Sequence, residues 1–148
     1  MKAREIMTPH PEAVTPSDHV QRAAEIMRDL NVGFVPIVND RASMQLKGVI
    51  TDRDITIRHV AAGHPRECKV HEHMTAEGIA TVGPEAALDE VLEAMKRAQV
   101  RRIPVVERDG RIIGVIAQAD IAVKEAPSHP EEVAETVERI SEPAKPQR

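Results

Sequence analysis

The sequence predicts an α/β protein, α+β in its layout, made of two copies of one strand–helix–strand–strand–helix unit. Short motifs recur in the same order about 67 residues apart, which is typical of an internal repeat. Each copy also carries an apolar stripe at helical spacing and two short β-branched runs bounded by turn residues. One such unit is too small to bury its own sheet. We therefore expect two units packed around one core by pseudo-twofold symmetry.

Four motifs define the repeat. The small drift in their spacing falls in predicted loops, and chance similarity would not keep four motifs in order. The pairs are Met7-Thr8 with Met74-Thr75, Val14-Thr15-Pro16 with Val82-Gly83-Pro84, VGFVPIV (32–38) with VRRIPVV (100–106), and GVITDRDI (48–55) with GVIAQADI (114–121).

The first helix of each copy follows the second motif. In the first copy we expect Thr15 to be the N-cap, Pro16 the first helical residue and Asp18 part of the first turn. The apolar stripe that follows predicts the buried face of the helix. Its members are Val20, Ala23, Ala24, Met27 and Leu30 in the first copy, and Leu88, Val91, Leu92 and Met95 in the second.

Each copy then continues as a hairpin and a short helix. The second strand ends in Gly-Val-Ile in both copies and leads directly into a helix that starts near Asp54 or Asp120. The predicted first strands are residues 34–38 and 103–106, with turns at Asn39-Asp40 and at residues 108–110.

The repeats set the expected domain organisation. We expect repeat 1 over residues 1–63, a linker over 64–73, repeat 2 over 74–125 and a charged, proline-containing tail over 126–148. Residues 131–140 fit a short amphipathic helix, and the last few residues of the tail are expected to be disordered.

Composition excludes several classes of function. One Phe and no Trp or Tyr leave no stacking platform for single-stranded nucleic acid, and a net charge of −4 argues against general binding to nucleic acid or acidic membranes. The single cysteine, Cys68, cannot form an internal disulfide, which fits a reducing compartment. No apolar run approaches the roughly 20 residues of a membrane span, and the N-terminus lacks a signal-peptide pattern. We expect a cytoplasmic protein.

With both repeats aligned, the chain resembles the CBS domain. That family has a Val-x-Pro helix start, an apolar-Pro-Val-Val strand and a terminal Gly-h-h-Thr/Ser-x-x-Asp motif, where h is hydrophobic. This sequence is similar at Gly48-Val49-Ile50-Thr51-Asp52-Arg53-Asp54 and around Pro36 and Pro104, and the resemblance covers about residues 1–125. A tandem pair of this kind, a Bateman module, resembles small stand-alone bacterial CBS proteins, including the hypoxic-response type.

The resemblance carries functional expectations. It implies a non-catalytic module that holds an adenine nucleotide (AMP, ADP or ATP) between its repeats, with S-adenosylmethionine as another candidate. It also implies a homodimer in which two modules form a flat disc, and an effector protein of unknown identity that reads the bound state. Because such signalling needs different ligand affinities in two states, sequence alone does not identify the stimulus.

The segment 51–54 is the first candidate for ligand binding. A strand that ends at Ile50 and leads into a helix leaves Thr51 at the N-cap and Asp54 at the third helical position, beside free backbone N–H groups. In the CBS family these positions bind the ribose hydroxyls, with the Thr near ribose or phosphate. The alternative is a simple capping box, which stabilises a helix start without any ligand.

Arg101 and Arg102 precede a strand of the second repeat. By resemblance, cations at this position reach the phosphate of the nucleotide whose ribose is held by Asp54, and the planar guanidinium suits phosphate oxygens. The alternative is a solvated strand start with surface ion pairs. The equivalent pair in repeat 1, Gly33-Phe34, offers no charge. By position in the family, the adenine would lie against Pro11, Glu12, Val35 and Pro36.

The second repeat departs from the family pattern. Ala117 stands where repeat 1 has Thr51, so the hydroxyl of the cap is absent and a weaker site is expected. The candidate residues of this site are Asp120, Ile79, Ala80 and Pro104.

Histidine and cysteine give weaker signals. His71 and His73 face the same way only in an extended segment, and no Cys or Asp partner is evident nearby, so we expect a solvated linker and no metal site. Cys68 is expected to be an inert or mildly oxidisable thiol.

Three functions compete. The first is the ligand-sensing module, and the second is a CBS dimer that binds no nucleotide and acts by interaction. The Ala at position 117 favours the second to some degree, because it shows that one pocket has drifted. The third is an enzyme, for which the sequence offers no set of base, nucleophile and metal ligands.

Overall fold

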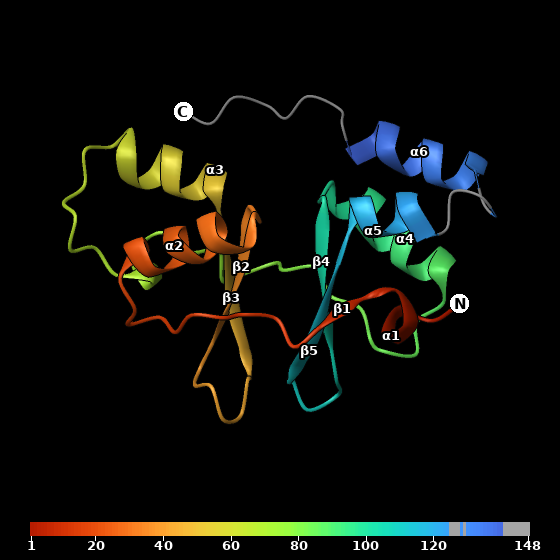
Figure 1. The fold of residues 1–148 in the computed structure, drawn as a ribbon, viewed down its shortest axis with the longest axis horizontal. Helices are drawn as coiled ribbons and strands as arrows, with labels where there is room; N and C mark the ends of the chain where they lie inside the picture. The colour runs from red at the N-terminus through yellow and green to blue at the C-terminus, as the bar shows by residue number, and fades with distance from the viewer. Residues whose placement is uncertain (125–127, 129, 141–148) are drawn as a thin grey trace. The chain divides into compact units, whose positions relative to one another are not determined.

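The computed structural model describes residues 1–124, 128 and 130–140, and the chain divides into two compact units (Figure 1). Unit 1 comprises Met1–Pro9, Ala80–Glu107 and Ile113–Arg148, and unit 2 comprises His10–Ile79 and Arg108–Ile112. Repeat 1 follows the predicted order of strand, helix, two strands and helix, whereas in repeat 2 an isolated bridge at Thr75 stands in place of the first strand. The mixed α/β fold class with two such repeats is confirmed.

Unit 2 is built on an antiparallel hairpin. Its two strands pair from Phe34–Thr51 to Val38–Leu46, with one irregularity after Ile37, and Val14 adds a parallel bridge to Ile37. Helix α2 (Val20–Leu30) packs on strand β2 (Phe34–Val38). The elements are α2 (Val20–Leu30), β2 (Phe34–Val38), β3 (Leu46–Thr51), α3 (Asp52–Asp54), the π-helix η1 (Ile55–Val60) and the 3₁₀ turn η2 (Val70–Glu72).

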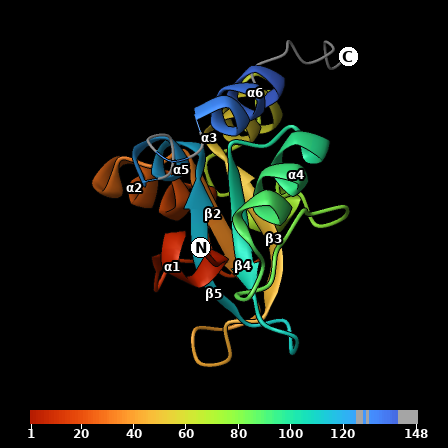
Figure 2. The ribbon, with the colours of Figure 1, turned by 90° about the vertical axis from the view of Figure 1, so that its right-hand side faces the viewer.

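Unit 1 contains a three-stranded sheet of β1 (Thr8–Pro9), β5 (Ile112–Ala117) and β4 (Arg102–Val106), in that order. Figures 1 and 2 show β5 and β4 side by side. Val82 makes a parallel bridge to Val105, as Val14 does to Ile37 in unit 2. The elements are α1 (Ala3–Ile6), β1 (Thr8–Pro9), α4 (Leu88–Ala98), β4 (Arg102–Val106), β5 (Ile112–Ala117), α5 (Gln118–Lys124) and α6 (Pro130–Ile140).

The Met-Thr motifs explain why the compact units cut across the repeats. Thr8 pairs with Val115 of the second repeat, and Thr75 pairs with Val49 of the first. Each unit therefore takes one short extended segment from the other repeat. The glycine of the Gly-Val-Ile motif lies under that segment in both units, which gives these two repeated motifs a common structural role.

These two glycines should differ in their tolerance of a methyl group. A Cβ on Gly48 would lie 2.8 Å from the backbone oxygen of Thr75. A Cβ on Gly114 would overlap Met7 Sδ and lie 2.8 Å from Met7 Cγ, but these are side-chain atoms that a change of rotamer can move. The Thr75 segment is held by two hydrogen bonds with Val49, each 2.9 Å long. We expect Gly48→Ala to lower the free energy of unfolding by about 1–3 kcal/mol and Gly114→Ala by less. Urea unfolding followed by far-UV circular dichroism measures both, and equal losses would contradict this account.

The predicted start of the first helix is wrong. Thr15 N–H donates to the Asp18 carboxylate at 2.8 Å and Asp18 N–H donates to Thr15 O at 3.1 Å, which closes a tight turn before the helix. The N-cap is His19, whose extended backbone bridges to Lys69. Helix α2 therefore begins at Val20.

The stripe on α2 is partly confirmed. Val20, Ala23 and Met27 are buried as predicted, but Ala24 is exposed and Leu30 is 52% exposed. The remaining core position is Ile26, so the buried face is shifted around the helix axis from the predicted one. In α4 all four predicted positions are buried (Leu88, Val91, Leu92 and Met95).

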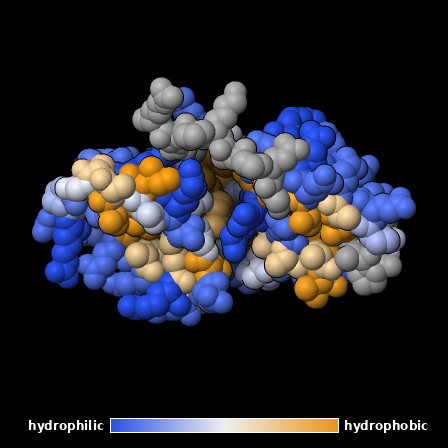
Figure 3. Space-filling view, turned by 90° about the horizontal axis from the view of Figure 1, so that it is seen from above, coloured by the Kyte–Doolittle hydropathy of each residue, from blue (hydrophilic) through white to orange (hydrophobic). Residues whose placement is uncertain are grey.

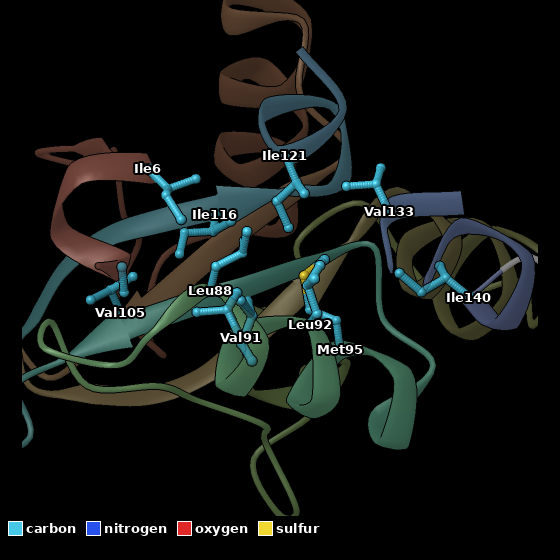
Figure 4. Packing of buried hydrophobic residues seen from close by; sticks show 12 residues of the cluster. Ile6, Leu88, Val91, Leu92, Met95, Val105, Ile116, Ile121, Val133 and Ile140 are labelled. Carbon is cyan, nitrogen blue, oxygen red and sulfur yellow. The ribbon is translucent and has the colours of Figure 1, made fainter. Parts of the chain in front are cut away.

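The tail helix belongs to the core of unit 1. Residues 130–140 form α6, close to the predicted 131–140, and this helix packs against α4. Val133 and Ile140 join the buried cluster of this unit, and Figure 4 shows both side chains near Leu92, Met95 and Ile121. The expected disorder of the last residues concerns positions outside the described ones.

The surface is mixed in character. On the face shown in Figure 3, hydrophobic side chains lie in small groups among hydrophilic ones. Large hydrophobic side chains that are exposed include Leu30, Val60 and Val123. Among the described residues, no helix combines the length and the hydrophobicity that crossing a bilayer requires.

Candidate functional site

The Thr51–Asp54 segment adopts the predicted geometry at the end of β3. Thr51 is the extended N-cap of α3, and Asp54 N–H donates to its Oγ1 at 3.1 Å. Thr51 N–H in turn donates to Asp54 Oδ2 at 3.0 Å. These reciprocal bonds form a capping box at the start of α3. The capping box also fixes the Asp54 carboxylate at the end of β3.

The second oxygen of Asp54 lies near Arg58, one helical turn later. Arg58 Nη2 is 3.7 Å from Asp54 Oδ1, and the Asp54 side chain is 15% exposed. Each carboxylate oxygen can accept more than one hydrogen bond, so Asp54 keeps acceptor capacity for two neighbouring hydroxyls. A mostly buried, oriented carboxylate of this kind suits a ribose diol.

The second repeat reproduces half of this geometry. Ala117 N–H donates to Asp120 Oδ2 at 3.0 Å, which matches the bond from Thr51 to Asp54. The return bond is missing because Ala117 has no hydroxyl. Among the described residues, the second repeat thus keeps one of the two capping-box bonds that the first repeat makes.

Arg101 and Arg102 line a hollow of about 440 Å³ within unit 1. Gln118 N–H donates to Arg101 O at 2.8 Å, and Asp52 N–H makes the equivalent bond to Gly33 O in unit 2 at 3.0 Å. This bond holds the start of α5 beside the arginine pair. The volume falls within the range of small-molecule sites. The other lining residues are Ala117, Gln118, Ala119 and Ala122.

The remaining predicted residues are distributed over both units. Pro11, Glu12, Val35, Pro36 and Ile79 belong to unit 2 together with Thr51 and Asp54, whereas Ala80, Pro104 and Asp120 belong to unit 1 together with the two arginines. Val35 is 1% exposed and part of the core of unit 2. With so little exposed surface, Val35 offers an adenine ring almost no contact area within this unit. The association of Asp54 with Arg101 and Arg102 stays a prediction.

The expectation that no cysteine lies near the linker histidines is wrong. His71 is exposed, but His73 is buried and its ring lies close to His59 and to Cys68. Burial, followed by the nearby rings of His59 and His64, lowers the pKa of His73, which keeps this imidazole neutral at neutral pH. The sequence offered one indication of this cluster, namely the histidines and the cysteine that occur at irregular spacing over residues 59–73.

Sequence comparison gives a consistent set of relatives. A family model described as CBS domain matches residues 3–59 and 70–125. The CBS domain-containing protein YhcV of Bacillus subtilis is 34% identical over 122 residues, which cover 82% of this chain and 84% of that protein. Hypoxic response protein 1 of Mycobacterium tuberculosis is 35% identical over 127 residues, 86% of each protein.

Solved structures with the same fold include two informative ones. Hypoxic Response Protein I with two coordinated zinc ions is 34% identical, with a TM-score of 0.75 over 84% of this chain and 98% of that one. The CBS domain pair of protein MJ0100, in complex with 5'-methylthioadenosine and S-adenosyl-L-methionine, is 25% identical, with a TM-score of 0.72 over 83% of this chain and 94% of that one.

Proposed function

The chain belongs to the CBS-domain family, as its repeats predict, and on this premise we propose that it is a non-catalytic regulatory module that binds one adenine nucleotide. AMP, ADP and ATP are the candidate ligands, and S-adenosylmethionine is the alternative of the same class. The CBS pair of protein MJ0100 binds adenosine-type ligands, which supports this ligand class. The effect of binding would be read by a partner protein, and the module would act as a cytoplasmic homodimer.

The observation that carries the proposal is the fixed carboxylate of Asp54 beside Thr51 at the end of β3. This position matches the terminal aspartate of the family motif, which binds ribose. The carboxylate is oriented by the capping box before any ligand arrives, so binding would require little reorganisation. We assign the ribose hydroxyls to Asp54.

Phosphate binding is assigned to Arg101 and Arg102. The two side chains line one hollow together with residues of the Ala117–Ala122 segment, and their charges suit an anion. Their pairing with Asp54 follows from their position in the family pattern. The repeat-equivalent pair, Gly33-Phe34, carries no charge. The proposal therefore expects one competent site per chain and a weak one around Asp120.

Isothermal titration with AMP, ADP, ATP and S-adenosylmethionine tests this function. We expect saturable binding near one nucleotide per chain, and a loss of affinity of about 10–100-fold in Arg102→Ala, because charge-assisted hydrogen bonds contribute about 1.5–3 kcal/mol. The matched control is Arg97→Ala, which removes the same charge from an exposed position of α4.

Two results would count against the proposal. Equal affinities of the Arg97→Ala and Arg102→Ala proteins would remove the phosphate assignment. The absence of heat with all four ligands, from a folded protein, would favour the CBS dimer that binds no nucleotide.

A further inference from the structure

Four side chains with nitrogen or sulfur donors lie close together in unit 2, outside the proposed nucleotide site. They come from three consecutive segments: His59 from the π-helix η1, His64 and Cys68 from the loop that follows it, and His73 from the turn after η2. His73 is 2% exposed and Cys68 is 4% exposed. Buried polar groups of this kind need partners. Here His73 lies against His59, and the Cys68 thiol lies near His64 and Glu72.

The donor atoms already lie at near-coordination distances. His59 Nδ1 is 3.0 Å from His73 Nε2, and His64 Nδ1 is 3.8 Å from Cys68 Sγ. The ligand atoms of His59, Cys68 and His73 all lie within 4.8 Å of one another. Around a tetrahedral zinc ion the donors are about 3.3–3.6 Å apart, as metal–ligand bonds of about 2.0–2.3 Å require. Small rotations of the side chains would bring the donors of His59, Cys68 and His73 to that spacing, and His64 already lies close to it on the side of Cys68.

His64 completes the set geometrically. Its ring centroid is 4.9 Å from that of His73 and 6.4 Å from that of His59. His64 N–H donates to His59 O at 3.0 Å, an i to i+5 bond that continues the π-helical hydrogen-bond pattern. The backbone thus holds these two imidazoles on the same side of the loop.

Backbone hydrogen bonds also fix the other two donors. Cys68 O accepts from Val20 N–H at 3.0 Å, and His73 N–H donates to Val70 O at 3.0 Å. Val70 is fully buried in the core of unit 2. The cluster is therefore preorganised by the fold, which lowers the entropic cost of binding an ion.

Donor chemistry selects the ion. One thiolate with three neutral imidazoles is a set that suits zinc, whereas magnesium and calcium require oxygen donors. Cys68 and His73 are buried and His59 is partly buried, whereas His64 is exposed. The exposed His64 leaves a route by which an ion can reach the cluster. We propose that His59, His64, Cys68 and His73 bind one Zn²⁺ within unit 2.

Zinc at this position would join the linker between the repeats to the helix that carries Asp54. Arg58 already makes part of this link, because its Nη1 donates to His73 O at 3.1 Å and to Thr75 Oγ1 at 3.3 Å. Burial and the charge of Glu72 raise the pKa of the Cys68 thiol. Zinc would displace that proton and hold the thiolate.

Metal binding to the full chain tests the site directly. Protein freed of metal by a chelator is titrated with Zn²⁺ in competition with a chromogenic chelator, and with Co²⁺ followed by absorption spectroscopy. We expect one ion per chain, a thiolate-to-cobalt charge-transfer band that is absent from Cys68→Ser, and an affinity for Zn²⁺ reduced by about 100-fold or more in His73→Ala.

The controls separate ligand loss from unfolding. His71→Ala removes an exposed imidazole outside the cluster and should bind Zn²⁺ as the parent does. His64→Ala removes the exposed ligand, so it should keep the fold by circular dichroism and still lose affinity. Equal Zn²⁺ affinity in the parent, His64→Ala and Cys68→Ser proteins, or a cobalt complex without the charge-transfer band, would overturn the assignment.

Discussion

Asp54→Ala is expected to lower the affinity for AMP by about 10–100-fold, whereas Asp120→Ala should leave it nearly unchanged. The first change removes an oriented carboxylate that would accept bonds from the ribose hydroxyls, and such charge-assisted bonds contribute about 1.5–3 kcal/mol. Asp120 occupies the equivalent position in the repeat, where Ala117 provides no hydroxyl to complete the cap. The two variants thus compare the competent site with the weak one in a single protein.

Loss of Asp54 has two expected effects, on AMP affinity and on the capping of α3, which have to be measured separately. Asp54 also accepts the bond from Thr51 N–H, so its removal should cost about 0.5–2 kcal/mol of stability as well. Asp54→Asn keeps an oxygen that can accept this bond and should stay closer to the parent in stability while still binding AMP more weakly. Titration calorimetry and urea unfolding measure the two effects. A larger loss of AMP affinity in Asp120→Ala than in Asp54→Ala would reverse the assignment of the sites.

Local features of the fold follow directly from the sequence. The hairpin strand Phe34–Val38 has the predicted bounds, and Thr51 and Asp54 form the predicted cap. These features depend on neighbouring residues: β-branched runs, turn residues and a Thr-x-x-Asp motif. The start of α2 could not be derived in this way, because a bridge between His19 and Lys69, some fifty positions later, holds the N-cap residue in an extended conformation.

Contacts between residues far apart in the sequence could not be predicted in the same way. Thr8 pairs with Val115 and Thr75 with Val49, and segments of two residues carry no periodicity that would reveal such pairing. The histidine cluster depends on a π-helical turn, which no sequence pattern predicts and which brings His59 and His64 to the same side. The sequence showed the residue types for this site, but their convergence follows from the fold.

The packing of the C-terminal helix α6 was also not predicted from the sequence. Its amphipathic pattern predicts a helix, yet composition places it in a charged tail apart from the repeats. In the structure, Val133 and Ile140 are each 6% exposed and belong to the core cluster of unit 1. A helix with a buried face is part of the unit that it covers, whatever the charge of its opposite face.

A chain that ends at Lys124 is therefore expected to lose roughly 3–6 kcal/mol of unfolding free energy relative to a chain that ends at Ile140. Burying one Val or Ile side chain contributes about 1.5–3 kcal/mol, and α6 buries one of each. The ion pair of Lys96 with Glu135, at 3.6 Å, adds little because Glu135 is mostly exposed. Removing α6 also uncovers the faces of α4 and α5 that it contacts.

The measurement is urea unfolding followed by far-UV circular dichroism, since the chain has no Trp or Tyr to report by fluorescence. The chain that ends at Ile140 is the matched control, because it retains all of α6. Within the full chain, Val133→Ala should lower the unfolding midpoint and Glu138→Ala, at an exposed position of the same helix, should not. If the chain that ends at Lys124 were as stable as the control, the buried face of α6 would contribute nothing to unit 1. The core of that unit would then be complete within the two repeats.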